Sequence, residues 1–187
     1  NEYGVQKKAT TTSTVTGAGA VLLSAQPSKI RVSAFTPGKI CDWNYSDAND
    51  MGVAMAPAAY DTLNRHFQST NTDFKDYDLI ATGDLSQLGF SFLMDLLYQD
   101  EHPVEHRLHD CGLMIYDTSE QDVFCGGSGC ACSMCVSMSK LLKEIEQGNY
   151  QRVMVIATGA LLSPVAIQQK ESIPCIAHAI VYERSEG

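Results

Sequence analysis

Three short apolar segments without regular polar alternation constrain the fold of this chain most strongly. They cover residues 77–82, 152–160 and 175–182, and each has the length of a strand rather than that of a helix. Strands with apolar residues on both faces are typical of sheets that carry helices on both sides. Because these segments alternate with helical patterns, we predict an α/β fold with a mixed, mostly parallel five-stranded sheet covered by helices.

Three helical patterns accompany these strands. Residues 50–67 place apolar side chains at helical spacing, but Pro57 is best tolerated in a first turn, so this helix is expected to start near Met55. A second helix is predicted from the amphipathic run at residues 85–98. A third is predicted over residues 130–147, and Gly148 after it is a typical stop signal.

Further strands are expected in the first part of the chain and near its middle. Residues 13–25 and 30–42 are rich in β-branched and apolar side chains, and a turn at Pro27 separates them. We therefore predict that they pair as an antiparallel hairpin inside the sheet. The apolar run at residues 111–116 predicts one more short strand.

Composition and charge narrow the class of protein. A chain of 187 residues with 44% apolar and 19% charged residues can bury the core of one globular domain. The net charge of −9 leaves no basic stripe, which argues against nucleic acid as a partner. No window approaches the roughly 20 apolar residues that span a bilayer. Seven cysteines, an odd number, favour reduced thiols over a disulfide framework.

The domain organisation follows from the same residues. Residues 1–12 are mostly polar and are interpreted as a linker leading into one domain over residues 13–187. Because Asn1 is not a start methionine and no signal peptide follows it, the chain is expected to be cut from a longer parent.

Several cysteines and histidines invite a metal interpretation. Four cysteines form a C-x4-C-x-C-x2-C cluster: Cys125, Cys130, Cys132 and Cys135. Cys130 and Cys132 would point away from each other on the predicted helix, so packing is the favoured interpretation over zinc or an iron–sulfur centre. The histidines within residues 102–109 are interpreted as part of a solvated segment, and His178 as a core residue of its strand. No metal site and no cofactor are predicted.

Eight strings spread over the chain resemble a known family. They are GVQ at 4, TVTGAGA at 14, DMGVAMAPAA at 50, YDLIATGDL at 77, DCGLMIY at 110, GGSGC at 126, VIATGALLSP at 155 and IPCIAHA at 173. With the order of the predicted elements, they make the chain similar to the C-terminal half of the stage V sporulation protein AD family, whose members have the thiolase fold. The N-terminal half, which carries the nucleophile position in this fold, is absent from the chain.

The resemblance implies that the catalytic positions are vacated. In condensing enzymes of the β-ketoacyl synthase III type, a histidine and an asparagine of the second half stabilise the oxyanion. The resemblance places these two positions at or beside Gly83 and Gly127. Glycine has no side chain to donate, and losing one such donor costs on the order of a hundredfold in rate. The resemblance therefore implies a protein that is not an enzyme and has no catalytic residues.

The resemblance also implies a ligand, dipicolinic acid (pyridine-2,6-dicarboxylate), with or without calcium, which is taken up during sporulation and released in germination. Helix starts beside glycine-rich turns offer backbone N–H groups to such a dianion. The candidate ligand-binding residues are Asp50, Met51, Gly52, Gly83, Asp84, Gly127, Ser128 and Gly129. Asp84 would repel a carboxylate, so we expect it to cap the following helix or, less favourably, to meet a bound calcium.

The implied partners are the N-terminal half of the same protein and other stage V sporulation membrane proteins. These would hold the protein peripherally at the inner membrane of the forespore or spore. A homodimer is a further expectation that stays open. Two alternative functions remain at this point: an acyl-CoA condensing enzyme with unfamiliar oxyanion donors, and a scaffold that binds membrane proteins without a small ligand.

Overall fold

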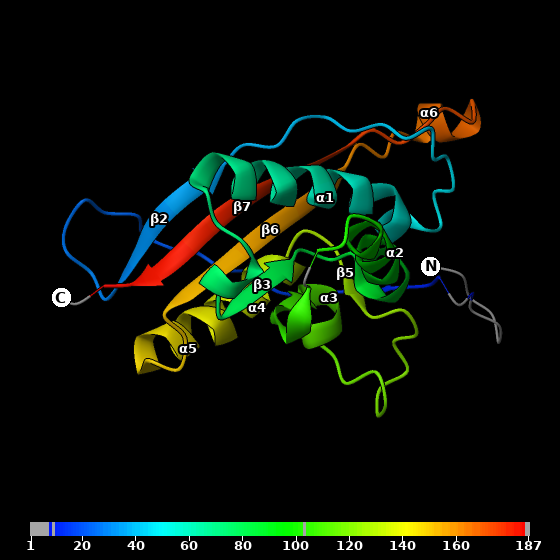
Figure 1. Cartoon of the computed structure of the whole chain (residues 1–187). Coiled ribbons are helices and arrows are strands. Elements are labelled where there is room, and N and C mark those ends of the chain that lie inside the picture. Colours follow the sequence, from blue (N-terminus) through cyan, green and yellow to red (C-terminus); the bar gives the residue numbers. More distant parts are fainter. Residues whose placement is uncertain (1–7, 9, 103, 186–187) are drawn as a thin grey trace.

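The main sheet of this chain has five strands among the residues that the structure, a computed structural model, describes: 8, 10–102 and 104–185. The strand order is β2 (Ile30–Thr36), β7 (Cys175–Arg184), β6 (Arg152–Ala160), β3 (Leu79–Thr82) and β4 (Leu108–Asp110). Strand β3 is parallel to both of its neighbours, whereas β7 is antiparallel to both β6 and β2 (Figure 1). The predicted α/β fold with a mixed five-stranded sheet is confirmed.

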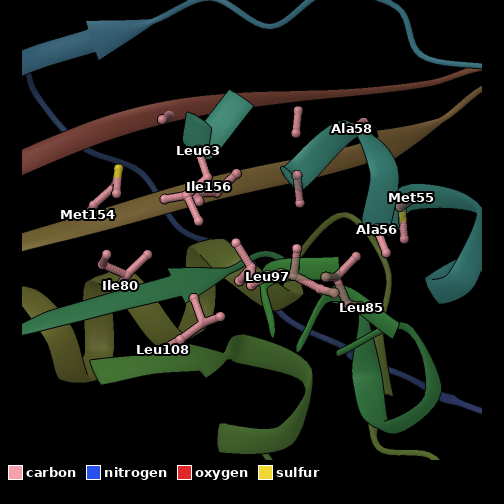
Figure 2. Packing of buried hydrophobic residues seen from close by; sticks show 14 of the residues in the cluster. Met55, Ala56, Ala58, Leu63, Ile80, Leu85, Leu97, Leu108, Met154 and Ile156 are labelled. Carbon is pink, nitrogen blue, oxygen red and sulfur yellow. The ribbon is translucent and has the colours of Figure 1, made fainter. Parts of the chain in front are cut away.

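One face of the sheet packs against the two long helices α1 (Met51–Thr70) and α2 (Ser86–Gln99). Ile80 of β3 and Ile156 of β6 point into this layer and are fully buried. Figure 2 shows Ile156 close to Leu63 of α1. Burial of one such side chain contributes about 1.5–3 kcal/mol, so this layer supplies much of the driving force for folding.

The other face carries the alternate residues of the same strands, because successive side chains of a strand point to opposite sides. Leu79 and Val153 lie on this face and pack against α4 (Cys132–Val136) and α5 (Leu142–Gln147). A π-helical turn, η3 (Ser137–Leu141), joins these two helices. The predicted two-sided burial of the strands is therefore observed where helices lie on both faces.

The remaining elements are short: β1 (Ser13–Thr14), β5 (Gly127–Ser128), α3 (Cys111–Met114), α6 (Pro164–Gln168), and the 3-10 helices η1 (Phe74–Asp76) and η2 (Glu105–Arg107). Helix α6 lies in the connection between β6 and β7, and Ser163 accepts a hydrogen bond from Ala166 N at 3.4 Å at its start. No helix among the described residues is long and apolar enough to cross a membrane. The predicted linker over residues 1–12 lies partly outside the described residues.

The predicted hairpin between residues 13–25 and 30–42 is wrong. Strand β1 has only two residues and pairs in parallel with β5, while β2 pairs with β7. The physical reason lies in the glycines of the connecting segment. A Cβ on Gly17 would lie 2.6 Å from Cys135 Sγ, and one on Gly19 would lie 2.5 Å from Met134 Cγ. The segment is thus pressed against α4 and cannot lie beside β2.

Two other boundary predictions are also wrong. Helix α1 starts at Met51 rather than near Met55, because Asp50 accepts a hydrogen bond from Val53 N at 3.3 Å and begins the helix there, leaving Pro57 inside it. The run at residues 111–116 is no strand, since the edge strand β4 ends at Asp110 and helix α3 follows at once. Periodicity alone does not separate helix from strand in so short an apolar run.

One part of the sheet surface is uncovered among the described residues, and we call it the open face. It consists of Val32 and Phe35 of β2, Ala157 of β6 and His178 of β7, all exposed. Phe35 is 61% exposed and stacks on the ring of His178, with 6.2 Å between the ring centroids. The interpretation of His178 as a core residue is therefore wrong, because no helix in the described part of the chain covers this end of the strand.

Candidate functional site

A buried carboxylate holds the start of helix α2. Asp110, at the end of β4, is 1% exposed. It accepts hydrogen bonds from Thr82 Oγ1 at 2.6 Å, from Leu85 N at 2.8 Å and from Ser86 N at 2.9 Å. Burial raises the pKa of Asp110 to about 6, although these three hydrogen bonds favour the charged form. Asp110 thus supplies acceptors for two N–H groups that the helix itself leaves unpaired.

A second carboxylate, Asp84, ties three segments together. Its Oδ2 accepts hydrogen bonds from Ser128 Oγ at 3.0 Å and from Gly129 N at 2.9 Å, and its Oδ1 accepts one from Thr158 Oγ1 at 2.9 Å. These contacts join the end of β3, the glycine-rich loop and strand β6. The expectation that Asp84 caps the following helix is wrong, because Asp110 performs that task.

The two glycines at the predicted oxyanion positions have little room for a side chain. A Cβ on Gly83 would lie 2.6 Å from Thr158 Oγ1 and 2.8 Å from the backbone nitrogen of Thr158. A Cβ on Gly127 would lie 2.6 Å from Ile115 Cγ2 and 3.1 Å from Tyr116 Cε2. At Gly83 the obstacle includes backbone, which cannot rotate away, whereas at Gly127 it consists of three side chains, those of Ile115, Tyr116 and Val15.

The glycine-rich loop is held by contacts within the protein. Ser86 Oγ donates to Gly127 O at 2.7 Å, and Gly129 N donates to Asp84. Gly129 has a φ of 107°, which favours glycine over any other residue. Helix α4 begins only at Cys132, so the loop does not open directly into a helix as expected. The Gly129 N–H therefore faces a protein carboxylate rather than an open anion site.

The start of α1 lies beside the start of α2. A Cβ on Gly52 would overlap the carbonyl oxygen of Leu85, and one on Gly89 would overlap the backbone of Gly52. Gly52 is thus a packing residue that lets the two helices approach closely. Asp50 accepts a hydrogen bond from Tyr45 OH at 3.2 Å, and burial followed by the charge of Asp50 raises the pKa of Tyr45 to about 12.

The structure therefore brings the candidate residues into one region but gives most of them internal partners. Asp84, Ser128 and Gly129 are in direct contact. Gly83 lies beside Thr158, Gly127 contacts Ser86, and Gly52 contacts Leu85, which places all three turns around the end of β3. Met51, the first residue of α1, is half-buried.

The sequence reasoning missed two residues of this region, Asp110 and Thr158. Asp110 is the last residue of β4, and Thr158 lies in the second half of β6. A polar residue at the carboxyl end of a parallel strand is a usual site position, and this signal could have found both. Their partners are distant in sequence, so spacing alone does not reveal the contacts.

Cys111 and Cys132 do not supply a reactive nucleophile to the candidate site. All seven cysteines are free, and Cys111 and Cys132 are buried in the core on the α4 side of the sheet. Burial raises the pKa of both thiols, that of Cys132 to about 12, so they stay protonated near neutral pH. Among the described residues no group of three or more histidine, cysteine, aspartate or glutamate side chains could hold a metal ion.

The chain is similar to the solved structure of 3-oxoacyl-[acyl-carrier-protein] synthase III from Aquifex aeolicus VF5. The TM-score is 0.44 and the identity 13%, over 85% of this chain and 54% of that chain. The synthase is of the condensing-enzyme type that the sequence resemblance named. A likeness at this level carries no argument about activity.

Sequence comparison identifies the family. The family model for stage V sporulation protein AD matches residues 1–183. Stage V sporulation protein AD of Bacillus subtilis (strain 168) is 54% identical over 186 residues, which are 100% of this chain and 55% of the relative. The chain thus spans about half the length of this curated relative. It belongs to the stage V sporulation protein AD family.

Proposed function

We propose that this chain is part of a non-catalytic sporulation protein that binds dipicolinic acid and supports its uptake into, and release from, the spore. The observation that carries the non-catalytic part is the closure of Gly83. A Cβ there would lie 2.8 Å from Thr158 N, so a histidine donor has no room unless the backbone moves. Without such a donor, the oxyanion of an acyl transfer would lack its main stabilisation at this position.

The charges of the site favour dipicolinate accompanied by calcium over the free dianion. Asp84 is half-buried and already accepts hydrogen bonds from the glycine-rich loop and from β6, and Asp110 lies near it. Both carboxylates would repel a dianion, whereas calcium takes six to eight oxygen ligands and would offset the repulsion. The hydroxyls of Ser128 and Thr158 are the nearby side-chain groups that could turn to a ligand carboxylate.

The open face supports the N-terminal half of the same protein as a partner. Val32 and Phe35 are 43% and 61% exposed, and exposed apolar side chains that lie together mark interaction sites. The curated relative is nearly twice as long as this chain, so its remaining part is a natural cover. The membrane proteins of stage V sporulation, which the family resemblance implies, would then place the longer protein at the inner membrane of the forespore or spore.

Isothermal titration of the full-length protein tests the ligand. Dipicolinate is titrated with and without calcium, and benzene-1,3-dicarboxylate, which has the same two carboxylates but no ring nitrogen, is the matched control ligand. We expect binding of dipicolinate, stronger with calcium, and much weaker heat from the control. If dipicolinate produces no heat in either condition while membrane proteins are still captured, the protein is a scaffold. Turnover in an acyl-CoA condensation or thiolysis assay would show an enzyme instead.

Two substitutions locate the ligand. Thr158→Val removes a hydroxyl beside Asp84 and is expected to weaken binding about tenfold, the usual effect of one lost hydrogen bond to a charged group. Thr118→Val, in an exposed turn, is the control and should leave binding unchanged. Asp84→Asn should reduce the calcium dependence of binding if Asp84 faces the cation. Unchanged affinity in both site variants would move the ligand elsewhere in the protein.

A further inference from the structure

Cys41 and Cys175 lie directly opposite each other, and Cys175 is the first residue of β7. Cys41 N donates to Cys175 O at 2.8 Å, and Cys175 N donates to Cys41 O at 2.8 Å. Such a reciprocal antiparallel pair has its Cα atoms about 5.5 Å apart. Disulfides span Cα separations of about 4.4–6.8 Å, so the backbone is already at bonding distance.

The two thiols face the same side of this short ladder. Directly opposed residues of an antiparallel pair project their side chains together. Each thiol donates a weak hydrogen bond to a nearby backbone carbonyl, Cys41 Sγ to Lys39 O at 3.7 Å and Cys175 Sγ to Ile173 O at 3.4 Å. Rotation about the Cα–Cβ bonds is therefore the main change that a covalent bond between them requires.

Access to the two sulfur atoms is unequal. Cys41 is half-buried, whereas Cys175 is 2% exposed. A small oxidant in solution would reach Cys41 first, and Cys175 would then lie behind it as the second thiol. This is the usual arrangement of an attacked and a resolving cysteine.

A bond at this place would clamp the segment that leads into the candidate site. Cys41 lies in the connection between β2 and α1, where Ile173 N also donates to Tyr45 O at 2.8 Å. Tyr45 in turn donates to Asp50, which begins α1. The cross-link would hold the approach to the start of α1 against β7, and it would close a loop that contains most of the domain.

We propose that Cys41 and Cys175 form a reversible disulfide when the protein meets a low-molecular-weight disulfide as oxidant. The Cys41 thiolate attacks one sulfur of the oxidant and releases its first thiol. The Cys175 thiolate then attacks the Cys41 sulfur and releases the second thiol. The protein loses two electrons and two protons, which the oxidant takes up as its two thiols.

The reaction is slow near neutral pH and becomes faster as the pH rises. Burial raises the pKa of both thiols, that of Cys175 to about 11, so only a small fraction of thiolate is present at neutral pH. The disulfide is therefore expected to form under sustained oxidation and not as a rapid response to an oxidant.

Peptide mapping of the full-length protein tests the proposal. The protein is equilibrated with excess oxidised glutathione at alkaline pH, its free thiols are alkylated, and it is digested without reduction. We expect a peptide pair that joins Cys41 to Cys175 and separates on treatment with dithiothreitol. The midpoint of thermal unfolding should rise by about 5 °C or more, because a disulfide that closes a long loop restricts the unfolded chain.

Two serine variants serve as the matched pair. Cys41→Ser should lose both the cross-link and the rise in the unfolding midpoint, whereas Cys132→Ser, in α4, should keep both. Recovery of Cys41 and Cys175 as alkylated thiols would overturn the proposal. So would a stable glutathione adduct on Cys41 beside an alkylated Cys175. If the cross-link forms but the unfolding midpoint does not rise, the disulfide does not hold the segment before α1 against β7.

Discussion

The two sides of the main sheet differ in what covers them. On the side of β3, helices pack on both faces, and Ile80 and Leu79 are 0% and 3% exposed. On the side of β2 and β7, helix α1 covers one face, while the opposite face leaves Phe35 and Val32 in solvent. Figure 1 shows α1 lying along β7 and β6, with α4 and α5 beneath the other side of the sheet.

The difference separates two tasks of the same sheet. The covered side fixes the turns of the candidate site, because Asp84 and Asp110 join the ends of β3, β4 and β6 there. The open face contributes nothing to those contacts and instead leaves apolar side chains exposed, which we propose a partner covers. The candidate site is thus built by the part of the chain that completes its own core.

The largest expected effect tests the covered side. Ile80→Ala should lower the free energy of unfolding by about 2–5 kcal/mol, because it leaves a cavity between β3 and α1. Chemical denaturation of the variant beside the unchanged protein measures this loss. A loss below about 1 kcal/mol would mean that this side is no better packed than the open face.

The buried carboxylate on the covered side should show a pH signature. The pKa of Asp110 is about 6 in the folded protein, whereas the ordinary aspartate value of 3.8 applies to the unfolded chain. As the pH rises, Asp110 therefore ionises first in the unfolded state. Its contribution to stability is complete below about pH 4 and is lost towards pH 6, by about 3 kcal/mol. The stability difference between the unchanged protein and Asp110→Asn should therefore fall from pH 4 to pH 7. A constant difference would contradict the raised pKa, since exposed carboxylates affect both proteins alike.

Adding one methyl group at each of two glycines tests how tightly each side of the sheet is packed. Gly83→Ala should cost about 1–3 kcal/mol, because the new Cβ would press on the backbone of Thr158. Gly159→Ala is the control, since its Cβ would have its nearest neighbour, Ile176 O, at 4.0 Å. Urea denaturation of both variants checks the contrast. Equal costs would show that position 83 has room for a side chain.

The smallest expected effect belongs to the open face. Phe35→Ala should change the stability of the 187-residue chain by less than about 0.5 kcal/mol, because the ring is mostly in solvent. In the full-length protein the same substitution should cost about 2 kcal/mol or more if the other half covers the ring. Comparing the loss of stability in the 187-residue chain with that in the full-length protein shows whether the other half covers Phe35. Similar small costs in both would show that this face stays exposed in the longer protein.

Local signals were sufficient for several elements. Strand β6 has the predicted bounds, and the observed α2 begins and ends one residue from those expected. The predicted helix over residues 130–147 ends at Gly148, whose φ of 86° is the left-handed cap that its glycine indicated. Each of these signals acts within a few residues, so the sequence carries them directly.

Local signals failed where neighbours in space decide the structure. The run at residues 111–116 is apolar enough for a strand, but β4 already occupies the edge next to β3 and the run turns into α3. Pro57 argued for a late helix start, yet Asp50 and the close approach of Gly52 to α2 begin the helix a turn earlier. Packing outweighed propensity in both cases.

The sequence by itself determined the fold class and the family, because strand periodicity, helix stops and motif strings are all properties of short segments. That Gly83 and Gly127 stand at vacated catalytic positions stays a prediction. Only the tertiary structure decided that Asp84 binds the glycine-rich loop and that Asp110 holds the start of α2. Asp84 and Thr158 are 74 residues apart, and Asp110 and Leu85 are 25 apart. Such contacts exist only after the sheet has brought the ends of β3, β4 and β6 together, so no local sequence pattern predicts them.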